Sequence, residues 1–449
     1  MDGGAIIRLL TGLGALLCTV PLCASELPDN VTVRETQLLR IATRGTSYPE
    51  SPYIYALLEG SYLADSYTAE GGLSISSSGP DRGAGINHLS VTWFGEDYDF
   101  KAGKSVMKLG VLDYMSTLDT VSPYRGAFFD DPNIYIRRIP EWMALFNGYP
   151  DDRLRLQGFC QAYDRDRQDL SSIYLRFALD SGLPLYIESL SRQNATAELL
   201  NQEIFLPAYH ESISPALYDH IRSQYDTKEG RPEQMLFGVT AEYAFESVTA
   251  GAVWINRYSE VPLVVLDANF TAAVETFGEG DAYLDALYGY LEQNDLDPIK
   301  GVEGYRYNLW GAYFETTYER YGIRGEVTLR ERVPALNRFS GLSTVGVGID
   351  TTREGVYHNL ELQWVRLDEY GVNMFAGILA TFFDWERNGP LEWRFSHYLL
   401  AGYYGGHKEI AVRPELLLKY EPFELQLQLL ISRKRSRNNS GIITLGMRF

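Results

Sequence analysis

The chain has 449 residues, a formal net charge of −19 and a pI of about 4.8, and 45% of its residues are hydrophobic. Nucleic-acid binding needs a basic surface, so this acidity argues against it. No run of about 18 apolar residues follows the first 25 residues, so a membrane protein built from helices is not expected.

The N-terminus has the pattern of an export signal. Arg8 precedes an apolar stretch at 9–22, and small residues follow at 23–25. A basic start, a short apolar core and small residues are typical of a signal peptide that is removed after secretion. We therefore expect a signal peptide at residues 1–25, followed by a polar periplasmic segment at 26–50. An uncleaved membrane anchor and lipidation at Cys23 are the alternatives.

From Tyr53 onward, apolar and polar residues alternate with a period of two, the pattern of strands with two different faces. Residues 235–246, for example, place Phe237, Val239 and Ala241 on the face opposite Thr240. The expected strands are about 53–65, 86–94, 99–111, 133–147, 153–163, 170–180, 183–192, 234–246, 249–258, 304–317, 321–332, 342–352, 356–366, 370–384, 389–404, 408–420, 423–433 and 441–449.

The lengths of the connections between these strands alternate. Short turns fall on one side of the expected sheet, and every long connection falls on the other. The long connections are 67–85, 112–132, 193–233, 259–303 and 333–341. Outer-membrane barrels have short periplasmic turns and longer extracellular loops. We predict an all-β fold, a transmembrane antiparallel β-barrel of about 18 strands at residues 51–449. If 170–192 is read differently, 16 or 14 strands are the alternatives.

Two of the long loops contain helical patterns. Asp281 could cap a helix that continues to about Glu292, and Ser214-Pro215 could open another, with proline at its first position. These loops are either compact and external, or folded into the barrel as a plug.

The last nine residues, 441–449, have the alternating pattern of a strand. Ile443, Leu445, Met447 and Phe449 share one face of it, and an aromatic residue closes the chain. This ending resembles the C-terminal signal that the barrel-assembly machinery of Gram-negative outer membranes reads. The resemblance implies an outer-membrane location, that machinery and outer-membrane lipids as partners, and a role for Phe449 in assembly.

A second stretch, residues 99–123, resembles a pattern in porin-like outer-membrane proteins of Gram-negative bacteria. In that pattern a glycine-rich strand, Gly-(Lys/Arg)-Gln-x-x-x-Trp-Gly, precedes an Asp and a Pro in the next loop. The matching residues are Gly103, Lys104, Gly110, Asp119 and Pro123, whereas Ser105 replaces the glutamine and Leu109 the tryptophan. The resemblance implies a barrel of the porin or polysaccharide-export kind, without a particular solute.

Motifs for enzyme chemistry are missing from the sequence. It contains no phosphate-binding loop, no His-Glu-x-x-His and no dinucleotide fingerprint, and its six histidines are not spaced like metal ligands. We therefore expect no catalysis, no cofactor and no metal. A rim lipase would need a serine near His358 and Asn359, and the neighbouring strands offer no obvious one.

Charged residues on the inward faces of the expected strands are the candidates for selectivity, because rings of basic side chains favour anions and acidic rings favour cations. A slip of one residue in the register would exchange the two faces. The predicted lumen-lining residues are Arg153, Arg155, Arg324, Glu326, Arg330, Arg332, Arg394, Arg413, Glu415 and Lys419.

These patterns predict a porin-like outer-membrane channel for the passive diffusion of small polar or anionic solutes. The alternative is a loop-plugged barrel that acts as a structural or partner component of a transport system. No nucleic-acid partner is expected, and a homo-oligomer is left open.

Overall fold

The computed structural model describes fourteen parts of the chain. They are residues 28–44, 48–49, 53–77, 83–122, 138–162, 235–258, 263–266, 299–303, 305–335, 338–368, 372–385, 391–404, 407–432 and 440–448. The expected signal peptide at 1–25, the expected helices in the long loops and Phe449 lie outside these parts.

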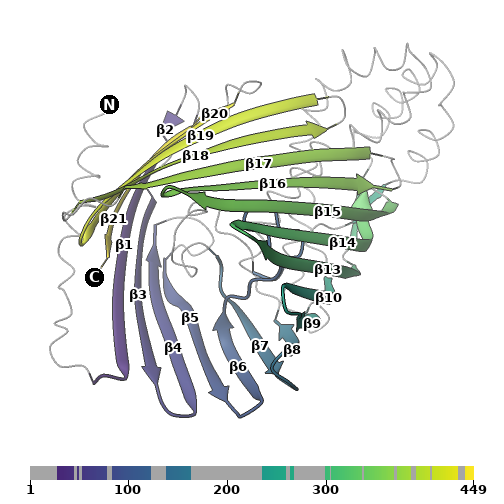
Figure 1. The fold of residues 1–449 in the computed structure, drawn as a ribbon, viewed down its shortest axis with the longest axis horizontal. Coiled ribbons are helices and arrows are strands. Elements are labelled where there is room, and N and C mark those ends of the chain that lie inside the picture. The colour runs from purple at the N-terminus through teal and green to yellow at the C-terminus, as the bar shows by residue number, and fades with distance from the viewer. Residues whose placement is uncertain are drawn as a thin grey trace.

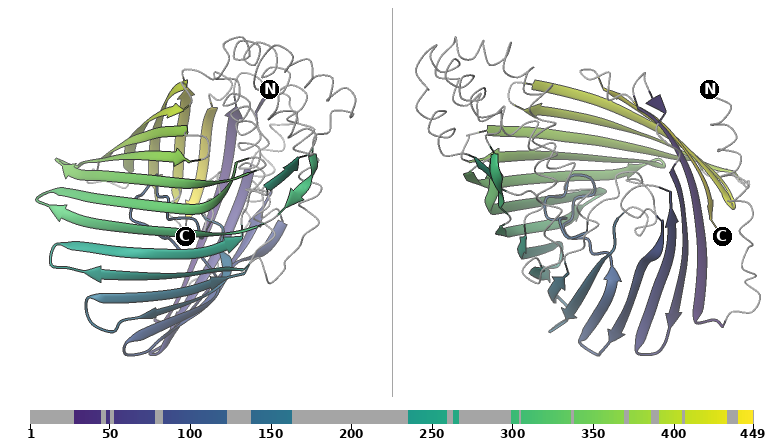
Figure 2. Two further views of the ribbon diagram at one scale, coloured as in Figure 1. Left: turned by 90° about the vertical axis from the view of Figure 1, so that its right-hand side faces the viewer. Right: turned by 180° about the vertical axis from the view of Figure 1, so that it is seen from behind.

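The described residues form one closed antiparallel β-barrel of 18 strands (Figures 1 and 2). The wall consists of β1 (Val31–Arg44), β3 (Tyr53–Leu63), β4 (Tyr67–Ser76), β5 (Gly83–Phe94), β6 (Tyr98–Ser105), β7 (Glu141–Gly148), β8 (Leu154–Gln161), β9 (Leu236–Ala244), β10 (Val248–Tyr258), β13 (Arg306–Tyr318), β14 (Tyr321–Ala335), β15 (Arg338–Arg353), β16 (Val356–Leu367), β17 (Val372–Trp385), β18 (Glu392–Tyr404), β19 (His407–Tyr420), β20 (Phe423–Ser432) and β21 (Ser440–Arg448). A two-residue strand, β2 (Tyr48–Pro49), pairs with β1, and β11 (Leu263–Leu266) pairs with β12 (Ile299–Glu303) outside the wall.

The first and last strands close the wall. Strand β1 pairs with β3 on one edge and with β21 on the other, placing Thr36 opposite both Leu57 and Arg448. All other wall strands pair with their neighbours in sequence order. The barrel therefore has no open edge, so the backbone groups of every wall strand find partners on both sides.

The outer face of the wall is apolar. On β15, Val345, Val347 and Ile349 are 39%, 48% and 41% exposed, and they alternate with the inward-facing positions Gly346 and Gly348. Large exposed apolar side chains recur in this way on nearly every wall strand. Such a band suits contact with lipid rather than with water. Among the described residues, no helix is long and apolar enough to cross a membrane.

The strand count agrees with the expectation, although two of the members differ. Residues 31–44, expected in a periplasmic segment, form β1, and residues 67–76, expected in an external loop, form β4. The expected strands at 170–180 and 183–192 lie outside the described residues. Strand β8 pairs directly with β9, so no further wall strand lies between these two.

The connections sort onto two ends of the barrel. Tight turns, such as 95–97, 245–247 and 354–355, join strands at one end. The long connections 106–140, 162–235 and 259–305 all leave from the other end. The expected external loop at 333–341 is instead mostly strand, because β14 and β15 extend to Ala335 and Arg338.

Candidate functional site

A loop inside the barrel is the feature on which a functional site can be built. Residues 106–122, called the inner loop below, follow β6 and lie within the ring of wall strands (Figures 1 and 2). The expected strand 99–111 therefore ends early, at Ser105. Gly110 turns the chain with a φ of 84°, a backbone conformation that residues with a Cβ rarely adopt.

Apolar side chains attach one side of the inner loop to the wall. Leu118 and Val121 are fully buried, and Met107 and Leu109 are nearly so. They share a core with residues of β7, β8, β9, β10 and β13. The wall members of this core are Met143, Phe159, Leu236, Val253, Ile255, Tyr307 and Leu309. This part of the barrel interior is therefore a packed apolar surface rather than open lumen.

Glycines on the inner face of the wall make room for two leucines of the loop. A Cβ added to Gly346 would lie 2.6 Å from Leu112 Cδ1, and one added to Gly348 would lie 2.8 Å from Leu112 Cδ2. A Cβ on Gly311 would overlap Leu118. Small residues at these inward positions let the inner loop approach the strands closely.

Glu326, an inward residue of β14, binds the backbone of the inner loop. Its Oε1 accepts hydrogen bonds from the N–H groups of Val111 and Leu112 at 2.6 and 2.9 Å. Its Oε2 accepts from Thr117 N at 3.0 Å, and the Ser116 hydroxyl donates to both oxygens. The side chain is only 3% exposed, so these donors replace water around the carboxylate.

Glu361, an inward residue of β16, does the same for the next part of the loop. Its Oε1 accepts from Asp113 N at 2.8 Å, and its Oε2 accepts from Tyr114 N and Met115 N at 3.1 and 2.9 Å. Gln363 on the same strand donates to the Met115 carbonyl at 3.0 Å. Two wall carboxylates thus bind the whole turn from 111 to 117.

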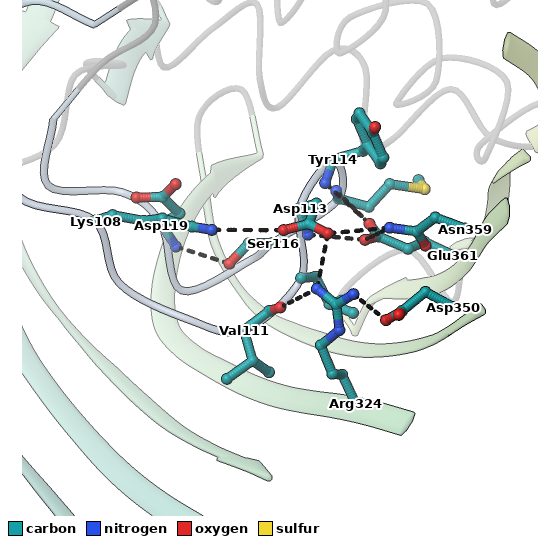
Figure 3. A network of polar contacts seen from close by, with 12 residues as sticks. Lys108, Val111, Asp113, Tyr114, Ser116, Asp119, Arg324, Asp350, Asn359 and Glu361 are labelled. Carbon is teal, nitrogen blue, oxygen red and sulfur yellow. Dashed lines mark hydrogen bonds and ion pairs between the residues drawn. The ribbon is translucent and has the colours of Figure 1, made fainter. Parts of the chain in front are cut away.

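Charged side chains complete this contact (Figure 3). Arg324 donates to the Val111 carbonyl at 3.0 Å and pairs with the carboxylates of Asp113 and Asp350. Asn359 also donates to Asp113, and Lys108 lies 3.7 Å from it. With Glu326 and Glu361, the cluster holds two cations and four carboxylates, a formal charge of −2. The positive charge of Arg324 is therefore balanced by the carboxylates around it.

A buried ion pair holds the far end of the inner loop. Arg138, fully buried just before β7, pairs with Asp119 and donates to the Ser122 carbonyl at 3.1 Å. Arg257 on β10 donates to the Thr120 carbonyl at 2.5 Å. Asp119 is the aspartate of the porin-like pattern, and its partner in the structure is Arg138. Pro123 lies outside the described residues.

The tip of the loop touches aromatic side chains further around the wall. Tyr114 meets Tyr398 of β18 edge to face, with ring centroids 5.8 Å apart, and Tyr398 meets Phe382 of β17 at 5.7 Å. The guanidinium of Arg413 lies 4.0 Å from the centroid of the Tyr398 ring, and that of Arg394 lies 6.0 Å from Phe382. Arginines and aromatic rings therefore meet at the tip of the inner loop, around Tyr114.

The predicted lumen-lining residues occupy several environments. Arg324 and Glu326 contact the inner loop, and Arg394 and Arg413 lie near its tip, whereas Glu415 accepts hydrogen bonds from Gln426 and Gln428 of the next strand. The other five predicted residues make their described contacts with the wall or its turns rather than with the inner loop. Arg153 precedes β8 in an exposed turn, and Arg155 donates to Asn147. Arg330 lies opposite Leu309 on one neighbouring strand and Leu342 on the other, and Arg332 stacks on Phe339. Lys419 pairs with Glu392 and Glu421.

Several residues that build the site were not among the predicted ones. Glu361 and Asp350 lie on inward faces that the alternation indicates, but the donors to Glu361 come from a loop without periodicity, and Asp350 pairs with Arg324 on the neighbouring strand. The inward glycines at 346 and 348 are the signal that could have pointed to a close approach. Among the residues that the structure describes, no group of three or more His, Cys, Asp or Glu could hold a metal ion.

Solved structures provide a comparison for the whole barrel. OccK5 (OpdH) of Pseudomonas aeruginosa is similar with a TM-score of 0.50 at 8% identity, covering 93% of this chain and 96% of that one. OccK3 (OpdO) of the same species has a TM-score of 0.49 at 10% identity, covering 94% and 96%. A BenF-like porin from Pseudomonas fluorescens Pf-5 has 0.49 at 8%, covering 94% and 99%.

No protein-family model and no curated protein sequence matches this chain. At such low identity, the likeness to solved structures concerns the fold. This chain shares its fold, a closed antiparallel barrel of 18 strands, with the OccK5 structure.

Proposed function

We propose that the chain is a porin-like channel of the Gram-negative outer membrane, through which small polar or anionic solutes diffuse passively without any catalysis. The observation that supports this proposal most is the inner loop, which is bound to one side of a closed barrel with an apolar outer face. A loop held against the wall narrows a barrel without necessarily filling it. Pore width and the charges that line it would then determine which solutes pass.

In this proposal the ten predicted lumen-lining residues have unequal roles. Arg324 is balanced by Asp113 and Asp350, and Lys419 by Glu392 and Glu421. Arg394 and Arg413 lie near the tip of the inner loop, and we assign the attraction of anions mainly to them because of that position. Aromatic rings beneath these guanidinium groups restrict their orientation.

Location and assembly belong to the same proposal. Residues 1–25 would be removed on export, Phe449 would be read by the barrel-assembly machinery, and outer-membrane lipids would surround the apolar band. The supporting observations are the export pattern at the N-terminus and the position of β21 as the strand that closes the wall.

Conductance in planar lipid bilayers tests the function. The purified protein should give discrete steps above the lipid background, with a reversal potential in a KCl gradient that indicates anion preference. Arg394→Gln and Arg413→Gln should reduce that preference. Arg353→Gln is the matched control, because Arg353 pairs with Glu354 in an exposed turn. An absence of steps would favour the loop-plugged barrel, and cation preference in the wild type would contradict the role of the arginines.

A further inference from the structure

The inner loop depends on side chains of the wall for its backbone hydrogen bonds. Between Val111 and Thr117 the chain has no helix or strand of its own. Six backbone N–H groups in this segment nevertheless donate to Glu326 or Glu361. Buried N–H groups without partners are costly, so the conformation of this segment is tied to those two carboxylates.

The geometry resembles an anion site in which the protein supplies its own anion. Successive N–H groups that converge on one point form a concavity that binds negative charge. Here Val111 and Leu112 converge on Glu326, and Tyr114 and Met115 converge on one oxygen of Glu361. Hydrogen bonds to an ionised acceptor are stronger than those between neutral groups. The side chains of Glu326 and Glu361 are 3% and 0% exposed, so water competes little for them.

We propose that Glu326 and Glu361 are positioning residues of the channel, which hold the inner loop against β13–β16 and thereby keep the rest of the lumen open. This inference rests on the proposed channel function. If the carboxylates are neutralised, the loop should leave the wall and enter the lumen repeatedly. Glutamine is the suitable replacement, because it keeps the shape of glutamate but exchanges one acceptor oxygen for a donor that faces other donors.

Thiol labelling measures the position of the loop without reference to transport. Thr117 is 8% exposed, and a cysteine at this position in a Cys160→Ser background should react slowly with a small maleimide. Glu326→Gln, Glu361→Gln and above all the double variant should raise the rate at least about tenfold, the factor that corresponds to about 1.4 kcal/mol. The same background without Thr117→Cys measures reaction at any other thiol.

The matched control is Glu242→Gln on β9. Glu242 also accepts a hydrogen bond, a partly buried one from the Tyr313 hydroxyl at 2.6 Å, and no hydrogen bond between Glu242 and the inner loop is found in the described residues. Its replacement should leave the labelling rate unchanged. Ser116→Ala provides a second variant, because it removes one donor to Glu326 and leaves both carboxylates in place. It should raise the rate by a smaller factor, and this result is informative even where a glutamate variant fails to fold.

Single-channel recording then connects the loop to transport. The wild type should conduct steadily, whereas the double variant, folded as judged by heat-modifiable gel mobility, should show frequent partial closures. If labelling and channel steadiness both match the wild type, the positioning role is wrong. If the wild type itself does not conduct, the proposed channel function fails, while accelerated labelling would still establish that the two carboxylates hold the loop.

Discussion

The side chain of Leu112 occupies the space that a side chain at Gly346 would need, since a Cβ there would lie 2.6 Å from Leu112 Cδ1. Gly346 is an inward position on β15, directly between the outward residues Val345 and Val347. The fit of the loop to the wall is therefore encoded at positions about 230 residues apart in the sequence, where neither residue alone indicates a contact.

A larger residue at Gly346 should displace the inner loop. We expect Gly346→Leu to destabilise the protein by about 1–3 kcal/mol, the usual range for overpacking. Unfolding in urea, followed by gel mobility, measures this loss. Combining it with Leu112→Ala should recover much of the stability, because the smaller side chain vacates the space. A double variant as unstable as Gly346→Leu would contradict the contact.

The buried ion pair between Asp119 and Arg138 should stabilise the inner loop strongly. Replacing either residue alone, as Asp119→Asn or Arg138→Met, should cost about 3–5 kcal/mol, because the remaining charge stays buried after it loses this ion pair. Urea unfolding of both single variants and of the double variant forms a double-mutant cycle. The double variant should be more stable than the sum of the single losses predicts, and simple additivity would show that the two residues do not interact.

Gly103 should be intolerant of substitution. Its φ is 136°, and a Cβ would overlap the carbonyl oxygen of Leu89 in the neighbouring strand. We expect Gly103→Ala to cost more than the roughly 1–3 kcal/mol of an unfavourable backbone conformation alone. Gly85→Ala is the control, since nothing lies within 4 Å of an added Cβ there. Equal stability of the two variants, measured in urea, would be evidence against this conformation at Gly103.

The two faces of the wall should respond differently to a new charge. Val347 is 48% exposed on the outer face, so Val347→Arg should cost about 2–4 kcal/mol if that face meets the middle of a lipid bilayer. Gln426 faces Glu415 on the inner side, and Gln426→Arg should be nearly neutral because it still donates to that carboxylate. Folding into lipid vesicles in a urea series measures both. Equal costs would argue against a lipid-facing outer surface.

Removal of Phe449 should reduce insertion into the outer membrane. The expected result is less folded protein in the membrane fraction, because the aromatic residue at the end of the sequence would no longer be recognised. Quantitative blotting of membrane fractions measures the difference. Unchanged insertion would contradict the resemblance on which the role of Phe449 is based.

Much of the barrel could be predicted from the sequence, because alternation with a period of two follows directly from a wall that meets lipid on one face. The prediction was wrong where this alternation is weak. In β1, Thr36 and Gln37 are followed by Leu38 and Leu39, so two buried leucines fall on opposite faces. In β4, Gly71-Gly72 is a turn signal, yet it lies within the strand opposite Leu89 and His88.

The site was harder to predict than the wall. The strand was expected to extend to residue 111, and Met107, Leu109 and Val111 do alternate with a period of two, although on the face opposite to Phe100 and Ala102 of β6. Tertiary contacts override this pattern, because the backbone there donates to Glu326 instead of to a neighbouring strand. Glu326 and Arg324 could be assigned to the inward face. Val111, which donates to Glu326, and Asp113, which pairs with Arg324, lie 215 and 211 residues earlier, and no local signal indicates either contact.

The seam between β1 and β21 makes the two ends of the chain mutually dependent. Residues 36–44 pair with residues 440–448, so the wall can close only when nearly the whole chain is available. Until then, the incomplete sheet presents two unpaired strand edges, which are templates for association with other chains. Contacts that distant in sequence also form slowly. Protection of the incomplete sheet until its last strand is available is therefore a requirement of this topology.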